Sequence, residues 1–267
     1  MRNIIAKPST IITVSIGNSL IYRGTFFMRF VAVLLSLSAQ LFFWKAAFVG
    51  RTEIANHTLE GLFGYLILAN MSYELSQPHN VMVSDHIQDG SLNHFLLLPY
   101  GFLDIMFWKL VGERMAFSLA SLLPLVICLF LFWEKISPEF IISPIGVILF
   151  IIYTLGGVIL HFLMDFNIGL LSFWFQKSDF LFVLKEIAVR ILAGLWFPFS
   201  LLPSAVQSVF EWLPFQFLGF VPARACLTPS AMQWTTPFIL MLWIALLYGL
   251  YLWIWNIGIK RYEAFGG

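Results

Sequence analysis

The sequence predicts an all-α membrane protein with six transmembrane helices, because of its composition and the spacing of its apolar stretches. Of the 267 residues, 60% are hydrophobic and only 11% are charged. Soluble domains carry roughly 25% charged residues, so this chain has too few to cover a water-soluble fold of its size. Lipid solvates Leu, Phe and Trp side chains directly, and aromatic rings favour the headgroup layer.

Six apolar stretches are long enough to cross the membrane. A helix needs about 20 apolar residues to cross roughly 30 Å of hydrocarbon. We expect these stretches to form a single membrane domain over residues 1–267. They run approximately over residues 26–48, 61–83, 111–133, 141–164 (or to 175), 180–200 and 236–257.

The Lys and Arg residues orient these helices, because cytoplasmic loops carry an excess of both. With an inward N-terminus, ten of them fall on the cytoplasmic side and four on the outer side, while Arg190 lies within the fifth stretch. Both termini are therefore predicted to be cytoplasmic. The ten are Arg2, Lys7, Arg23, Arg29, Lys109, Arg114, Lys177, Lys185, Lys260 and Arg261, and the four are Lys45, Arg51, Lys135 and Arg224.

Two further segments are apolar without being long enough to span. Residues 203–235 are interrupted by Pro214, Pro222 and Pro229, and proline breaks a helix by removing a backbone donor. Irregular backbone at membrane depth must be buried in protein or face water. We therefore expect a re-entrant helical hairpin on the outer side, between spans five and six; a loop lying flat on the membrane is the alternative. Residues 8–22 are expected to form an N-terminal interfacial helix.

Motifs for catalysis and cofactor binding are missing from the sequence. The chain has no G-x-x-x-x-G-K-[ST] loop for nucleotide phosphates, and no H-E-x-x-H, C-x-x-C or G-x-S-x-G. His79, His86 and His94 do not make the compact ligand set of a metal site. The net charge of +1 gives no sign of nucleic-acid binding. We expect no catalytic residue, metal or cofactor in this chain, and no nucleic-acid partner.

Three segments carry a resemblance to a known family. They are DHIQDGSLNHFLLLP at residues 85–99, FPFSLLP at residues 197–203 with prolines beyond it, and the C-terminal GIKRYEAFGG at residues 258–267. Together they resemble the type-2 ABC exporter permeases, in the branch of bacterial proteins with a Gly-Ser-Leu loop and an R-Y-E-A-x-G-G tail. Gln88 departs from the pattern, since relatives often carry a charged residue there.

The resemblance implies a permease subunit in the bacterial inner membrane that docks a cytoplasmic ABC ATPase. ATP and Mg would then be bound by the partner ATPase, which accounts for the missing phosphate loop. A second permease would complete the transporter, as a homodimer or a paralogous heterodimer, with membrane lipid around it. Residues 85–98 would be the coupling segment; an ordinary interfacial linker is the alternative. The expected contact residues are Asp85, Gln88, Asp89, Leu92 and Phe95.

Ionisable residues within the predicted spans are costly and usually functional. Helical spacing places three polar residues on one face of span two and pairs His161 with Asp165 in span four. The polar set either lines a substrate path or neutralises itself and fixes helix packing, and the sequence favours neither. It comprises Asn70, Glu74, Gln77, Asp165 and Arg190.

One specific ion pair is expected within that set. Glu74 lies about 13 Å and Arg190 about 15 Å above the cytoplasmic ends of their spans, at 1.5 Å per residue. Because the depths match and the charges are opposite, we expect Glu74 and Arg190 to pair. Glu186 and Asp165 compete as partners for Arg190.

We therefore expect an exporter permease that moves a hydrophobic or amphipathic substrate outward by alternating access. Lipids, peptides and natural-product antibiotics all fit this description. A membrane-embedded acyltransferase-like enzyme is one alternative, but it needs a clustered His/Asp or Ser/His site. A non-transporting membrane scaffold is the other, and the coupling segment argues against it.

The predicted topology is tested with reporter fusions. A reporter fused after Gly267 should report the cytoplasm, and one inserted near Lys135 should report the outer side, because an odd number of spans separates the two positions. The measurement is reporter activity in whole cells. Two reporters on the same side would show that the predicted number of spans is wrong.

Overall fold

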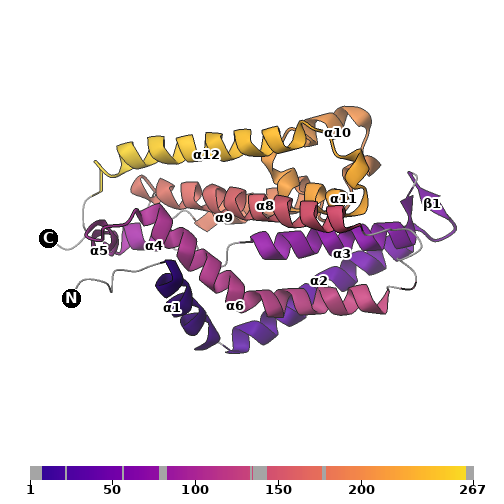
Figure 1. The fold of residues 1–267 in the computed structure, drawn as a ribbon, viewed down its shortest axis with the longest axis horizontal. Coiled ribbons are helices and arrows are strands. Elements are labelled where there is room, and N and C mark those ends of the chain that lie inside the picture. The colour runs from indigo at the N-terminus through magenta and orange to yellow at the C-terminus, as the bar shows by residue number, and fades with distance from the viewer. Residues whose placement is uncertain are drawn as a thin grey trace.

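Helices make up nearly all of the computed structural model, which describes residues 8–21, 23–55, 57–77, 83–132, 134, 143–175 and 179–262. The long helices lie roughly side by side along the longest axis of the molecule (Figure 1). Strands β1 (Glu53–Ile54) and β2 (His57–Thr58) form a small antiparallel hairpin with Glu53 opposite Thr58. The long helices are α2 (Arg23–Ala47), α3 (Leu59–Ser76), α6 (Phe102–Leu131), α8 (Pro144–Leu170), α9 (Asp179–Leu192) and α12 (Thr236–Gly258).

The prediction of an all-α membrane protein is confirmed. Within the described part of the chain, four helices are long and apolar enough to cross a membrane. They are α2, α6, α8 with its extension to Phe173 in η1 (Leu171–Phe173), and α12. Helices α3 and α9 occupy the second and fifth predicted spans, but they are shorter, at 18 and 14 residues.

Local backbone chemistry explains why these two helices end early. Helix α3 stops at Ser76 because Gln77 is extended, with φ −65° and ψ 119°, and a residue that precedes a proline in the sequence disfavours the helical region. Helix α9 stops at Leu192, before Gly194 with φ +72°, a left-handed backbone that glycine adopts without steric cost. The predicted ends at residues 83 and 200 are therefore too late.

The other expected elements have clear counterparts in the structure. Helix α1 (Pro8–Ile21) occupies the predicted interfacial segment, and α6 begins at Phe102, nine residues before residue 111. Residues 203–235 form a series of short helices, preceded by η2 (Phe199–Leu201). These are α10 (Ser204–Phe210), η3 (Pro214–Leu218), α11 (Phe220–Leu227) and η4 (Pro229–Ala231).

Helix α8 is the central element and contacts α3, α9, α11 and α12. Two glycines let the η3–α11 region approach it closely. A Cβ on Gly146 would lie 2.5 Å from the carbonyl oxygen of Cys226, and one on Gly157 would lie 2.6 Å from that of Phe217. The backbone of the η3–α11 region therefore packs directly on the backbone of α8, and six of the eight residues of α11 are buried.

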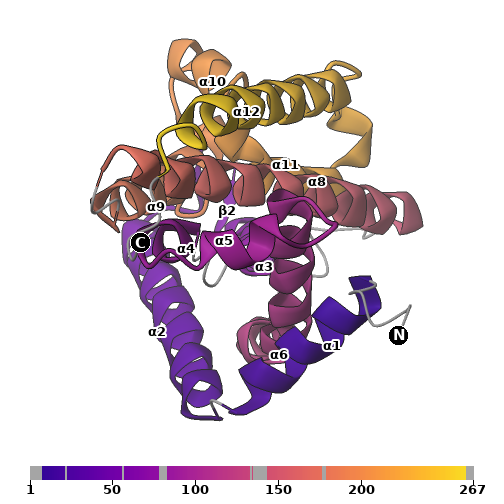
Figure 2. The ribbon, with the colours of Figure 1, turned by 90° about the vertical axis from the view of Figure 1, so that its left-hand side faces the viewer.

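The two ends of the molecule differ. Helices α4 (Val83–Gln88) and α5 (Leu92–Leu96) lie at one end, together with the C-terminal end of α12 (Figures 1 and 2). The β hairpin and α10 lie at the opposite end. Consecutive long helices run in alternating directions between these ends, as expected of a multi-pass membrane protein.

Buried apolar residues form two clusters, one toward each end. We call the first the hairpin cluster, which includes Leu66, Leu125, Leu160, Val189 and Phe217. We call the second the loop cluster, which includes Val83, Leu92, Leu110, Phe162 and Ile254.

A substitution at Gly157 tests the close seating of the hairpin on α8. Gly157→Ala should destabilise the protein by about 1–3 kcal/mol, because the new methyl group meets a backbone carbonyl that cannot rotate away. Gly249→Ala is the matched control within α12, since nothing lies within 4 Å of a Cβ there. The measurement is the free energy of unfolding in detergent, and equal stability of the two variants would contradict the described packing.

Candidate functional site: a buried polar layer and the α4–α5 segment

Charged side chains gather near the boundary between the two apolar clusters, which meet at Ile244 and Leu247 of α12. On α6, Arg114 lies between Leu110 of the loop cluster and Leu125 of the hairpin cluster. On α8, His161 follows Leu160 of the hairpin cluster directly. Helices α2, α3 and α9 contribute the remaining members. We call this set the polar layer: Arg29, Glu74, Gln77, Arg114, Ser121, His161, Asp165, Lys185, Glu186 and Arg190.

Glu74 of α3 is paired with Arg29 of α2. The Arg29 Nη2 donates to Glu74 Oε2 at 2.7 Å and to Gln77 Oε1 at 3.1 Å. The Arg29 Nε also donates to the Ser121 hydroxyl of α6. Both charged side chains are largely buried, with 15% and 11% of their surface exposed. The pair therefore joins three helices through one guanidinium.

Arg190 belongs to a different part of the layer. Its Nη2 lies 3.7 Å from Glu186 Oε1, one turn earlier on α9, and its guanidinium lies over the ring of Tyr73 at 5.7 Å. The predicted pair between Glu74 and Arg190 is therefore wrong. Arg29, which was expected on the cytoplasmic side, instead lies inside α2 and pairs with Glu74, because it is the nearer cation.

Lys185 is the centre of the second half of the layer. Its Nζ lies 2.8 Å from Asp165 Oδ1, 2.9 Å from His161 Nε2 and 3.2 Å from Glu186 Oε2. An ammonium only donates, so His161 Nε2 is an acceptor and the imidazole proton lies on Nδ1. The predicted pairing of His161 and Asp165 on one face of α8 is confirmed, and their shared partner is Lys185.

Gln77 connects the two halves. Its side-chain oxygen accepts from Arg29, and its Nε2 donates to Glu186 Oε1 at 3.2 Å. Arg114 extends the layer into α6, where its Nη1 donates to the Glu74 carbonyl at 2.7 Å. The side chain of Asn70 stands apart, since it donates to Gln40 at 3.1 Å and to the Leu66 carbonyl at 2.8 Å.

Exposure divides the layer into a buried part and an accessible part. Lys185 and Asp165 are 10% and 7% exposed, whereas the Arg190 side chain is 40% exposed. Arg190 lines a cavity of about 420 Å³ between α2 and the end of α9, together with Ser36 and Gln40. The ion pairs of the buried part fix helix packing, while Arg114 Nε, Arg114 Nη2 and His161 Nδ1 are buried without a hydrogen-bond partner among the described residues. Arg190 faces the cavity.

The α4–α5 segment has one exposed face and one buried face. Asp85, Gln88 and Asp89 are exposed. Leu92 is fully buried in the loop cluster, so the expectation that it contacts a partner protein is wrong at this position. A short helix shows too few residues for its apolar face to be assigned from the sequence. Phe95 is half-buried and stacks near His86, with ring centroids 4.7 Å apart.

The Gly-Ser-Leu motif has a structural role in this segment. Gly90 has φ +79°, which permits the tight turn between the two helices. The Ser91 N–H donates to Asp89 Oδ1 at 2.9 Å, and the Ser91 hydroxyl lies 2.7 Å from His86 Nδ1. The Ser91 hydrogen bonds lower the pKa of Asp89, while burial, reinforced by Lys109, lowers the pKa of His86. Leu92 then anchors the turn in the loop cluster.

The α4–α5 segment is packed firmly against the long helices. A Cβ on Gly169 of α8 would lie 2.7 Å from the Val83 side chain. Phe102 at the start of α6 stacks on Trp255 of α12, with centroids 5.8 Å apart. Tyr262 packs near Phe173 with centroids 6.1 Å apart; residues 263–267, which carry most of the C-terminal motif, lie outside the described part. The segment itself is joined to α8 through Val83 and to the start of α6 through Phe95, whose ring centroid lies 5.3 Å from that of Phe102.

Comparison with known proteins identifies one family. A family model described as "ABC-2 family transporter protein" matches residues 34–266, which include most of the polar layer and the whole α4–α5 segment. No curated protein and no solved structure matches the chain.

The pairing of Arg29 with Glu74 is tested by a double-mutant cycle. Arg29→Gln and Glu74→Gln should each destabilise the protein by about 3 kcal/mol, because each leaves a buried charge without its counterion. The double variant should recover much of the loss, since no lone charge remains. The measurement is the free energy of unfolding in detergent.

The Arg224–Glu211 pair provides a matched control. Its atoms are 3.5 Å apart and its side chains are about a third exposed, so the corresponding Gln variants should change stability by less than about 1 kcal/mol. Strict additivity of the Arg29 and Glu74 effects would contradict the pairing.

Proposed function

Because the chain belongs to the ABC-2 family of transporter proteins, and so is the membrane-spanning permease subunit of an ABC transporter, we propose that it exports its substrate outward from a bacterial cell. The permease is not itself catalytic, and the family works with ABC ATPases. We place it in the inner membrane with six spans, formed by α2, α3, α6, α8, α9 and α12. Without Arg29, Arg114 and Lys185, which lie in the polar layer, seven Lys and Arg residues remain on the expected cytoplasmic side against four on the outer side, and this excess supports cytoplasmic termini.

The ATPase docks on the exposed face of the α4–α5 segment. The observation that supports this proposal most strongly is the combination of exposed Asp85, Gln88 and Asp89 with the buried anchors Val83 and Leu92. An exposed acidic face suits complementary charge on a partner, and the buried anchors transmit its movement to the long helices. ATP and Mg bind to the ATPase, which supplies the energy for alternating access.

A second permease, identical or paralogous, covers the face of α2 and α9. Helix α2 exposes the apolar residues Phe27, Leu35 and Phe42 along its length. The cavity that contains Gln40 and Arg190 opens on this face, so it lies beside the proposed path between the two subunits. A substrate there meets aromatic rings, an amide and one guanidinium, which fits a hydrophobic or amphipathic molecule.

The region from residue 203 to 235 is proposed to be a re-entrant hairpin on the outer side. One limb, η3 and α11, is buried against α8, whereas α10 has no buried residue. Irregular backbone is tolerated at membrane depth where protein covers it, and the contacts of η3 and α11 provide that cover. The exposed α10 then lies nearer to the membrane surface.

Charge reversal on the α4 face tests the docking proposal. The double variant Asp85→Lys, Gln88→Lys should weaken binding of the ABC ATPase that co-purifies with the wild-type chain by about tenfold or more, since complementary charges become repulsive. Both positions are exposed, so the permease should remain folded. The measurement is the ATPase recovered with the tagged full-length permease at several salt concentrations.

Asp104→Lys is the matched control, because Asp104 is exposed at the start of α6 at the same end of the molecule. It should leave ATPase recovery close to wild type. Recovery of the ATPase by the double variant at the wild-type level would refute docking on α4.

A further inference from the structure

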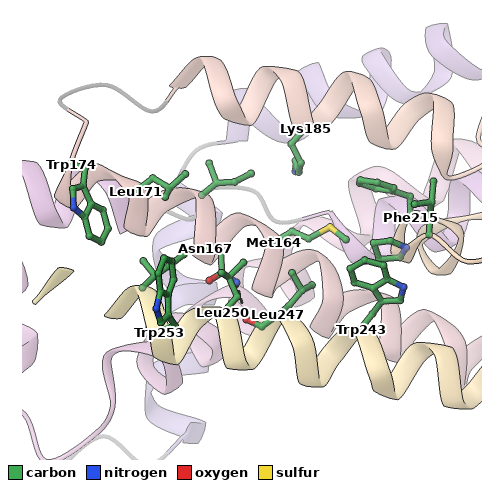
Figure 3. A pocket seen from close by; sticks show the side chains of 14 residues that line it. Met164, Asn167, Leu171, Trp174, Lys185, Phe215, Trp243, Leu247, Leu250 and Trp253 are labelled. Atoms are coloured by element: carbon green, nitrogen blue, oxygen red, sulfur yellow. Dashed lines mark hydrogen bonds between the residues drawn. The ribbon is translucent and has the colours of Figure 1, made fainter. Parts of the chain in front are cut away.

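We propose that a groove between α8, α9, α12 and η3 binds one phospholipid, whose headgroup donates a hydrogen bond to Asn167. The groove has a volume of about 660 Å³, which is within the range of ligand-binding clefts. Its walls are almost entirely apolar and aromatic (Figure 3). This inference depends on the membrane location of the chain and not on the direction of transport.

The groove has the shape of a slot for a hydrocarbon chain. It follows α12 from Trp243 to Ile254, a length of about 16 Å at 1.5 Å per residue. Phe215 of η3 lies beside Trp243 at one end, and Trp174 and Trp253 lie at the other (Figure 3). Indole rings are enriched at the membrane–water interface. Two of the three indoles that line the groove, Trp174 and Trp253, lie at the same end, so we place the headgroup there.

Asn167 provides the polar contact at that end of the groove. It is 5% exposed, and its Nδ2 donates to the carbonyls of Leu163 at 2.8 Å and Leu247 at 3.0 Å. Its Oδ1 is buried without a hydrogen-bond partner among the described residues. A buried acceptor left unsatisfied is costly, so a ligand that brings an N–H or O–H is favoured at this position.

The polar groups of the groove favour a ligand with a hydrogen-bond donor over a ligand that needs a free cation. Lys185 lines the groove, but its ammonium already contacts Asp165, His161 and Glu186. Its charge is therefore compensated within the protein, and no other cation is among the described residues that line the groove. A headgroup such as ethanolamine carries the required N–H donors, whereas choline carries none.

A bilayer lipid is the occupant because the groove opens on the membrane-exposed surface of α12. Trp253 and Leu250, which line it, are 63% and 41% exposed. Asn167 lies six residues before the end of the span formed by α8 and η1 at Phe173, about 9 Å from that end at 1.5 Å per residue, which is within reach of a headgroup that enters the groove. The chain of the lipid would fill the space between α9 and α12.

The test uses the full-length permease in proteoliposomes that contain a phosphatidylethanolamine with a photoreactive diazirine in one acyl chain. After illumination, adducts are mapped by mass spectrometry. We expect adducts concentrated on groove residues of α8 and α12. Leu250→Trp should lower this yield several-fold by filling the slot. Leu252→Trp should not, because Leu252 is equally exposed at 42% but lies outside the groove lining.

Competition by unlabelled lipids tests the hydrogen bond. Phosphatidylethanolamine should displace the probe about two- to tenfold better than phosphatidylcholine of the same chain length, which is the value of one hydrogen bond. Asn167→Leu should remove this difference. Adducts spread evenly over the exposed helices, equal yields in the two Trp variants, or equal competition by the two lipids with the wild-type protein would overturn the proposal.

Discussion

The structure depends on the requirement that a charge inside hydrocarbon be compensated by the protein itself. A single uncompensated charge at the centre of a helix costs at least about 2.5–3.5 kcal/mol on insertion scales. The chain meets this requirement by converging Arg29, Glu74, Asp165, Lys185 and Glu186 from four helices onto one layer. Apolar packing does not by itself select one partner helix over another, whereas an ion pair requires a particular opposite charge. The polar layer therefore determines which helices are neighbours.

Two parts of the molecule that meet at the polar layer, the α4–α5 segment with its long helices and helix α9, are held by different kinds of contact. The loop cluster joins the α4–α5 segment to α6, α8 and α12 through close contacts such as Val83 against Gly169. Helix α9 contributes only Val189 as a buried residue of its own. Its inner face is held by the ion pairs of Lys185 and Glu186. The contacts that join α9 to the rest of the polar layer are therefore made largely by charged side chains.

Much of this architecture could be read from the sequence, because the bilayer imposes a length and a polarity on each helix. The long apolar runs predicted the bounds of α2, α8 and α12 to within a few residues of those observed. The prolines after residue 203 predicted that this region forms short helices. The family resemblance was confirmed over residues 34–266. These features are local, so no knowledge of neighbouring helices was needed.

The features that escaped prediction depend on tertiary neighbours or on single backbone angles. Gly194 ends α9 because its φ is positive. The sequence alone does not distinguish such a glycine from one within a helix. The burial of Leu92 depends on where α4 meets α8. Arg29 was expected in the cytoplasm because it lies near the start of a helix. It also lies inside the first apolar stretch, and this position could have indicated that Arg29 needs a carboxylate partner.

The distribution of the polar layer along the chain constrains how the protein enters the membrane during synthesis. Arg29 is made 45 residues before Glu74, and Asp165 leaves the ribosome before Lys185. Helices α2 and α8 therefore reach the insertion machinery while their counterions are still absent. Release of α2 into lipid together with α3, and of α8 together with α9, would avoid the cost of about 2.5–3.5 kcal/mol for a lone charge. The order of the charges along the chain thus favours insertion of these helices in pairs.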